Sequence, residues 1–100
     1  MQLKWTERYK LDENHVSKIN QVSGVYKLIY LDESSKYIVY YVGQAEDLNS
    51  RLNQHLPNNE TNTCCNKFLN QYGCYFRAAG VSKQSDRDGA EVALYNRLVA

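Results

Sequence analysis

The stretch GVYKLIYL, residues 24–31, followed by DESS and then KYIVYYVG, residues 36–43, decides how this chain folds. Both runs are rich in β-branched and aromatic residues, which favour strands, and the four residues between them are typical of a turn. The pattern predicts an antiparallel hairpin with a four-residue loop. This hairpin is the core of a small sheet.

The register of the hairpin brings two tyrosines together. A four-residue loop places Tyr26 directly opposite Tyr41, with their Cβ atoms about 5 Å apart on one face. The same register places Gly24 opposite Gly43 at the open end of the hairpin. Paired glycines would leave the rim of the sheet open to a ligand. A tyrosine pair that only stabilises the sheet is the simpler interpretation of the same register.

Helical patterns and one further strand surround the hairpin. The expected elements are a helix over residues 12–19 with Asp12 as N-cap, a helix over 47–56 with Leu48, Leu52 and Leu56 on its apolar side, a helix over 64–72 followed by Gly73, a strand over 74–79, and a last helix capped by Ser85 or Asp86. The predicted class is α+β, a small, mainly antiparallel three-stranded sheet flanked by helices. Residues 1–23 form an N-terminal extension with a short helix, and residues 24–100 form the domain.

Composition excludes several classes of protein. The chain has 100 residues, enough for one domain, and its 12 Lys and Arg nearly balance its 11 Asp and Glu. A net charge of +1 gives no general attraction to nucleic acid, so any anion site must be local. The apolar runs are too short to span a membrane and no leader pattern opens the sequence, so we expect a cytoplasmic protein without a membrane partner.

The cysteines do not predict a disulfide framework or a zinc site. There are three of them, an odd number, and two are adjacent. A metal could in principle be bound by a cluster of four side chains, His55, Cys64, Cys65 and Cys74. Their spacing matches no paired zinc-ligand motif. Small buried or half-exposed thiols in a reducing compartment are the favoured interpretation.

Three charged or titratable side chains stand out on the predicted helices. Arg51 and His55 are four residues apart, so they share a side of their helix and look toward the rim of the sheet.

Glu91 lies within the apolar arc of the last helix, which also contains Ala90, Val92, Leu94, Tyr95 and Leu98. A carboxylate on an apolar face requires a partner, so we expect a metal ion, a cation such as Arg51, or an open cleft in front of Glu91. Ion pairing of Glu91 with Arg51 or Arg87 is the structural alternative. Asp86 and Asp88 are explained as first-turn acids that favour the helix dipole.

Taken together, these residues resemble the motifs of the GIY-YIG nuclease domain. The resemblance rests on Gly24-Val25-Tyr26, on Tyr41-Val42-Gly43, on Arg51 eight residues after that glycine, and on a helical Glu91. It covers most of the chain, from Gly24 to about Leu98. It implies a small mixed sheet flanked by helices and metal-dependent hydrolysis of phosphodiester bonds in DNA.

The resemblance also implies a role for each residue. Tyr26 and Tyr41 correspond to the two motif tyrosines, one helping to activate the attacking water and the other orienting water or phosphate. Arg51 corresponds to the arginine that binds the scissile phosphate, and His55 to a histidine found in many members. Glu91 corresponds to the single carboxylate that holds one divalent cation, Mg²⁺ or Mn²⁺. Gly24 and Gly43 match the motif glycines, as substrate-binding positions.

Elementary chemistry agrees with these roles. Phosphodiester hydrolysis needs an activated water and neutralisation of a highly charged transition state. One carboxylate holds Mg²⁺ weakly, because the ion keeps several waters and takes substrate phosphate as a ligand. A tyrosine acts as a base only beside a cation, which Arg51 and the metal could supply. His55 is the competing base, because histidine titrates near neutral pH.

Two expectations concern what accompanies the domain. Members of the family commonly have an asparagine beyond the glutamate-bearing helix, where it helps to order the site. Asn96 lies within that helix and is not assigned this role. The domain is therefore expected to be truncated at its C-terminus, or its site to be incomplete. The near-neutral charge favours a separate or missing DNA-binding part. The alternative function is a non-catalytic module of the same fold that binds nucleic acid or protein through its tyrosine-rich rim, with bases stacking on Tyr26, Tyr40 or Tyr41.

Overall fold

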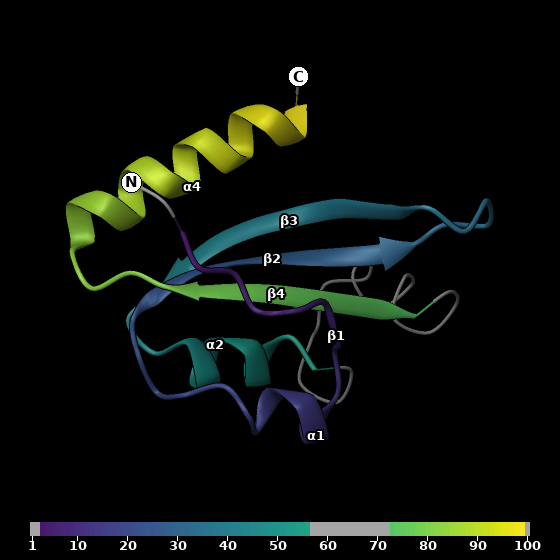
Figure 1. The fold of residues 1–100 in the computed structure, drawn as a ribbon, viewed down its shortest axis with the longest axis horizontal. Helices are drawn as coiled ribbons and strands as arrows, with labels where there is room; N and C mark the ends of the chain where they lie inside the picture. The colour runs from purple at the N-terminus through teal and green to yellow at the C-terminus, as the bar shows by residue number, and fades with distance from the viewer. Residues whose placement is uncertain (1–2, 57–72, 100) are drawn as a thin grey trace.

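The chain forms one antiparallel sheet with helices on both faces (Figure 1). The computed structural model describes residues 3–56 and 73–99, and the side chains of residues 98 and 99 lie outside that description. Its elements are β1 (Tyr9–Lys10), α1 (Glu13–Val16), β2 (Gly24–Leu31), β3 (Tyr37–Ala45), α2 (Leu48–Gln54), β4 (Cys74–Gly80) and α4 (Gln84–Val99). The strand order is β1-β4-β2-β3, and all pairs are antiparallel. The α+β class is confirmed, but the sheet has four strands where the sequence predicted three.

The additional strand is β1, which pairs with β4. Tyr9 lies opposite Phe76 and Lys10 opposite Tyr75, and the pairing continues in the hydrogen bond from the Leu11 amide to the Cys74 carbonyl, 2.8 Å. A two-residue strand has no periodicity from which it could be predicted, because its partner is more than sixty residues away. The N-terminal segment therefore belongs to the same sheet as the hairpin.

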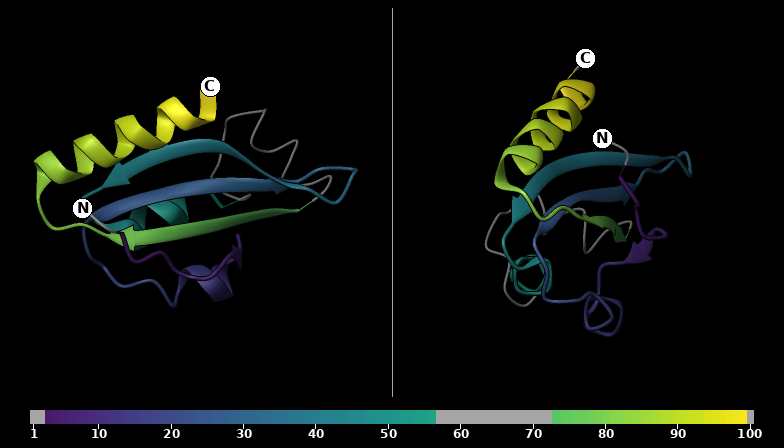
Figure 2. Two further views of the ribbon diagram at one scale, coloured as in Figure 1. Left: turned by 45° about the horizontal axis from the view of Figure 1, so that its top comes forward. Right: turned by 60° about the vertical axis from the view of Figure 1, so that its left-hand side comes forward.

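Alternation along the strands separates two cores. Tyr26, Leu28 and Phe76 face α1 and α2, whereas Val25 and Ala79 face α4. The larger core is made of Leu11, Val16, Tyr26, Leu28, Ala45, Leu48, Leu52, Leu56, Cys74, Phe76 and Ala78. The smaller one consists of Val25, Ala79 and Val81 with Leu3, Trp5, Ala90 and Leu94 packed against it. Figure 2 shows α4 lying along the β3 side of the sheet, away from α1 and α2.

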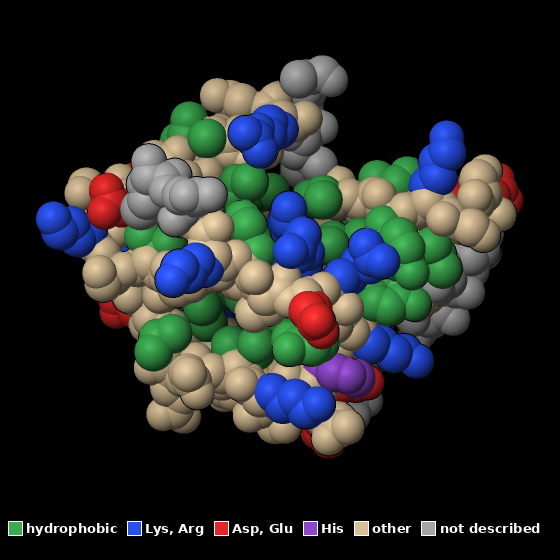
Figure 3. All heavy atoms as spheres, in the orientation of Figure 1, with side chains coloured by type: hydrophobic (Ala, Val, Ile, Leu, Met, Phe, Trp, Pro, Cys, Tyr) green, Lys and Arg blue, Asp and Glu red, His purple; other side chains and the backbone are tan. Residues whose placement is uncertain are grey.

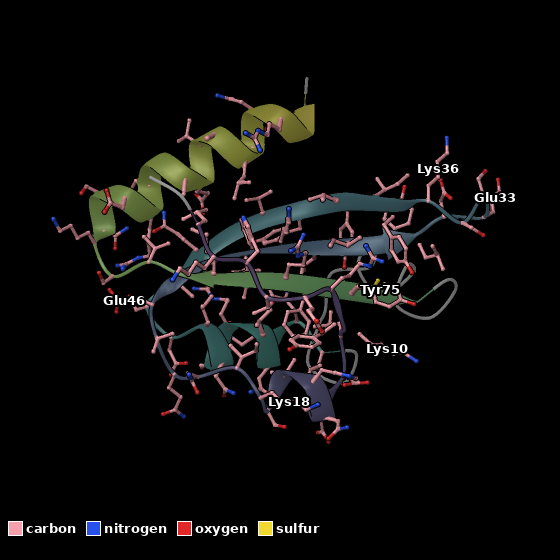
Figure 4. All side chains as sticks on the ribbon, in the orientation of Figure 1. Lys10, Lys18, Glu33, Lys36, Glu46 and Tyr75 are labelled. Carbon is pink, nitrogen blue, oxygen red and sulfur yellow. The ribbon has the colours of Figure 1, made fainter. Side chains whose placement is uncertain are left out.

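The hairpin loop is one residue longer than predicted. Leu31 lies opposite Tyr37, so the loop spans residues 32–36. The Asp32 carboxylate accepts hydrogen bonds from the amides of Ser34 and Lys36, at 2.9 and 2.8 Å, and Ser35 adopts a φ of 64°. This side-chain capping draws Lys36 into the loop. Figure 4 shows Lys36 and Glu33 at this tip, at the opposite end of the molecule from Glu46.

A β-bulge at Tyr40 shifts the register by one further residue. Leu28 lies opposite Tyr41, whereas Ile29 lies opposite Val39, so Tyr40 is the extra residue of β3. The two one-residue shifts together amount to two, which restores the original face because side chains alternate with period two. The predicted pairing of Tyr26 with Tyr41 is therefore wrong, although the face is right.

The helix boundaries agree with the prediction at their caps and differ elsewhere. Asp12 caps α1, as predicted, and Asp47 caps α2; each carboxylate accepts an amide hydrogen bond from the residue three positions on. The predicted caps of the last helix, Ser85 and Asp86, are wrong, because α4 begins at Gln84. The predicted helix over residues 64–72 lies outside the described residues. In the described part, no helix is long and apolar enough to cross a membrane.

Candidate active site

The centre of the site is the phenol of Tyr26 on β2. Its side chain is buried, and its hydroxyl shares a hydrogen bond of 2.9 Å with Nε2 of His55. The ring lies directly on Gly43: a Cβ added at this glycine would be 2.6 Å from Cζ of Tyr26. The missing side chain at Gly43 thus allows the ring to cross the edge strand and reach α2.

Tyr41 joins this pair from β3. It lies opposite Leu28, two positions from the predicted register, yet its ring centroid is 6.0 Å from that of Tyr26 and 5.2 Å from that of His55. Diagonal neighbours on one face of a sheet are within reach of aromatic side chains. The Tyr41 side chain is 37% exposed, so it forms the solvent-facing side of the cluster.

Helix α2 supplies His55 and Arg51. Leu48 and Leu52 are buried in the larger core, which sets the rotation of the helix and confirms the predicted apolar stripe. His55 is the C-cap residue, and the end of the helix therefore meets the Tyr26 hydroxyl. Arg51, one turn earlier, is exposed and lines a pocket of about 440 Å³ together with Gln44, Ser50, Gln54, Gln84 and Arg87.

Glu91 lies on α4, which packs on the sheet face opposite to that of Tyr26. Ala90 and Leu94 pack on the smaller core, and Glu91 beside them is half-buried. Its carboxylate is near enough to contribute to the raised pKa of Tyr26. Within the described part of the chain, it forms no hydrogen bond or ion pair, so the alternative pairing with Arg51 or Arg87 is not present there.

The apolar arc predicted around Glu91 is too wide. Val92 and Tyr95 are 59% and 55% exposed, and only Ala90 and Leu94 contact the core. The reason is that α4 packs mainly along the edge strand β3, and this edge covers a narrow strip of the helix. Leu98, also predicted in this arc, has its side chain outside the described residues.

Burial controls the ionisation of the central phenol. The pKa of Tyr26 is raised far above its ordinary value, first because the side chain is desolvated and then because of the neighbouring Tyr41 hydroxyl. Arg51 opposes this shift and Glu91 adds to it. The predicted activation by Arg51 is therefore outweighed by burial. At neutral pH, Tyr26 is a protonated phenol, and it shares its hydrogen bond with His55.

The motif glycines are packing positions in this structure. Gly24 lies opposite Ala45 and Gly80, not Gly43, and a Cβ on it would meet the Ala79 carbonyl oxygen. Both Gly24 and Gly43 are buried. The expected open rim between them is therefore filled, by a strand backbone at one glycine and by the Tyr26 ring at the other.

A polar network that the sequence did not reveal ties α4 to the site. The Gln44 side chain donates to the Asp88 carboxylate at 2.8 Å, and Gln84 donates to both Gln44 and Asp88. These hydrogen bonds lower the pKa of Asp88. Asp88 was expected only to favour the helix dipole. The network links the end of β3 to the first turn of α4, one turn before Glu91.

Next to this network, Arg87 is a buried cation. Its guanidinium donates to the carbonyl oxygens of Val81 and Ser82 and to the Gln84 side chain, and its Nε has no hydrogen-bond partner in the described residues. No sequence signal distinguished Arg87 from a solvated helix residue.

In the described part of the chain, the candidate donor for a divalent cation is one carboxylate, that of Glu91, which is half-buried and forms no ion pair there. In the described part, no group of three or more His, Cys, Asp or Glu could hold a metal by itself. Substrate phosphate and water would have to complete the coordination. Of the imagined cysteine cluster, Cys74 is buried on β4, and Cys64 and Cys65 lie outside the described residues.

The structure thus brings Tyr26, Tyr41 and His55 into direct contact, and Arg51 and Glu91 influence the pKa of the same phenol. No protein-family model, curated protein or solved structure matches this chain. The resemblance to the GIY-YIG domain rests on its motif residues alone.

Proposed function

We propose that this chain is a metal-dependent endonuclease domain that hydrolyses phosphodiester bonds in DNA. The observation that carries the proposal is the hydrogen bond of 2.9 Å between Tyr26 and His55, beside which Arg51 and Glu91 both influence the pKa of the same phenol. These side chains come from β2, α2 and α4. Convergence of an acid, a cation and a proton-transfer pair is the composition that phosphodiester hydrolysis requires.

The protonated state of Tyr26 determines how water is activated. A water beside the phenol passes its proton to the Tyr26 oxygen while the proton of Tyr26 moves to Nε2 of His55. The hydroxide then attacks phosphorus, the bond to the leaving oxygen breaks, and the leaving oxygen takes a proton from solvent. No phenolate accumulates, so the raised pKa of Tyr26 does not oppose this route, but the buried hydroxyl would have to open toward the exposed Tyr41 to admit the water.

The remaining side chains handle the phosphate. Arg51 is exposed, and its planar guanidinium suits two phosphate oxygens of the substrate. Tyr41 is the exposed member of the pair that it forms with Tyr26, and it orients water or phosphate with its hydroxyl. A divalent cation held by Glu91 would stabilise the negative charge that develops on the phosphate.

Plasmid nicking with Mg²⁺ or Mn²⁺ tests the proposal, with Glu91→Gln as the decisive variant. Removing the carboxylate charge while keeping the shape should lower cleavage by about a hundredfold or more, and EDTA should abolish cleavage. Melting should be unchanged or slightly higher, because a half-buried unpaired carboxylate is replaced by its neutral isostere.

Glu33→Gln is the matched control, since Glu33 is exposed at the hairpin tip (Figure 4). It should cleave as the parent does. Full cleavage by a well-folded Glu91→Gln would reject the metal-binding role. A parent protein that binds DNA but never cleaves it would favour the non-catalytic binding module.

A further inference from the structure

A cluster of cations lies on the sheet face that carries α4. Lys27 on β2 lies directly opposite Arg77 on β4, and their side chains point to the same face as Val25 and Ala79. Arg97 of α4 adds a third charge: Arg77 and Arg97 both lower the pKa of Lys27, after desolvation as the main cause. We call Lys27, Arg77 and Arg97, with Arg8, the basic face.

The basic face lacks acidic partners. None of its four cations forms an ion pair with a carboxylate anywhere in residues 3–56 and 73–99. Like charges directly opposite one another on a sheet destabilise it, so the Lys27–Arg77 pair costs folding free energy. In Figure 3, Lys and Arg side chains lie over the middle of the molecule as well as at its rim, and an acidic side chain lies near the middle. An anionic partner would relieve this repulsion.

Aromatic rings are interleaved with these cations. The Arg8 guanidinium lies 3.4 Å from the centroid of the Tyr37 ring, and Nζ of Lys27 lies 4.6 Å from that of Trp5. Tyr37 also meets Tyr75 edge to face at 5.3 Å. These contacts hold the long basic side chains in place without neutralising them.

A groove runs through the basic face. It has a volume of about 370 Å³ and is lined by Lys27 and Arg97 on the basic side and by Tyr37, Ile38, Val42 and Leu94 on the apolar side. Cations beside an apolar and aromatic floor are the combination that binds a single nucleic-acid strand, with phosphates on the cations and bases on the floor. An acidic peptide without aromatic residues would use the charges but would place no ring on the floor.

We propose that the basic face binds the backbone of a single DNA strand through Lys27, Arg77 and Arg97. The choice of DNA over other polyanions rests on the proposed nuclease function, whereas the anion-binding surface itself does not. The near-neutral net charge agrees with this, because the cations are concentrated locally.

The test is fluorescence anisotropy with a dye-labelled single-stranded DNA in EDTA, over a series of KCl concentrations. Each lost phosphate contact should reduce the slope of log K against log salt by about 0.7. At about 0.1 M salt, this change corresponds to a loss of affinity of about fivefold. Arg97→Ala should show this loss. Because Arg97 is exposed on α4, the variant should melt like the parent. The triple variant of Lys27, Arg77 and Arg97 should lose about a hundredfold.

Lys18→Ala and Lys83→Ala are the matched controls, because each removes an exposed charge outside the basic face. Figure 4 shows Lys18 beside α1, across the sheet from α4. They should bind almost as the parent does. Equal losses from Lys18→Ala and Arg97→Ala would overturn the proposal. Tighter binding of polyglutamate than of single-stranded DNA would also overturn it. So would a loss of affinity from Arg97→Ala that is seen with duplex DNA but not with single-stranded DNA.

The nuclease assay separates this inference from the proposed function. If the parent never cleaves DNA but the Arg97 and Lys18 variants differ as expected, only the nuclease proposal fails. If cleavage depends on Glu91 while Arg97→Ala and Lys27→Ala bind like Lys18→Ala, only the basic face proposal fails.

Discussion

Replacing Gly43 by alanine tests the packing on which the candidate site depends. The new Cβ would lie 2.6 Å from both Cζ and the hydroxyl oxygen of Tyr26, closer than nonbonded atoms can approach. The ring cannot easily move, because Tyr41 and His55 pack against it and its hydroxyl is hydrogen-bonded. The substitution must therefore displace the Tyr26 phenol from His55.

The magnitude follows from two opposing effects. Overpacking costs about 1–3 kcal/mol and a lost hydrogen bond about 1 kcal/mol, while replacing a strand glycine returns about 0.5–1 kcal/mol through the unfolded state. The net loss of unfolding free energy is about 2 kcal/mol. For a domain of this size each kcal/mol corresponds to about 4–8 °C, so the melting temperature should fall by about 8–16 °C.

Thermal and urea unfolding measure this change, and Gly89→Ala is the matched control. Gly89 lies in α4 with nothing within 4 Å of its added Cβ, so the same substitution there should stabilise the helix by about 0.5–1 kcal/mol. Opposite signs for the two variants are expected. If Gly43→Ala melted at or above the parent temperature, the packing of Tyr26 on Gly43 would be refuted. DNA cleavage should fall with Gly43→Ala and stay at the parent level with Gly89→Ala.

Two further predictions concern the phenol and the helix that meets it. Because burial raises the pKa of Tyr26 above the ordinary value of 10.0, the unfolded chain loses this proton first as pH rises. Its contribution to stability is fully present below about pH 10 and falls above it by up to about 1.4 kcal/mol per pH unit. Urea unfolding of the parent and Tyr26→Phe across this range should show the steeper loss in the parent; parallel curves would contradict it. Asp47→Ala removes the cap that accepts a hydrogen bond from the Ser50 amide at 3.0 Å. It should lower the free energy of unfolding by about 1 kcal/mol in urea titrations, and it should reduce DNA cleavage because α2 carries Arg51 and ends at His55. Asp47→Asn should change little.

Local patterns in the sequence predicted the elements that local physics controls. The alternation of residues 24–31 determined which side chains of β2 share a face, and Asp12 marked the start of its helix because capping involves residues only three apart. The leucine stripe of α2 likewise followed from helical periodicity. These signals also predicted that Tyr26 and Tyr41 share a face and that His55 looks toward the sheet.

Tertiary structure decided what depends on residues distant in sequence. The Asp32 loop and the bulge at Tyr40 set the register of the hairpin. Strand β1 forms through its pairing with β4. The buried strip of α4 is narrow because the helix packs mainly on one edge strand, β3. Burial by the surrounding layers, which no short pattern encodes, keeps the Tyr26 phenol protonated. The Lys27–Arg77 pair likewise arises only when β2 and β4 come together, because strand pairing joins residues that are fifty apart in the chain.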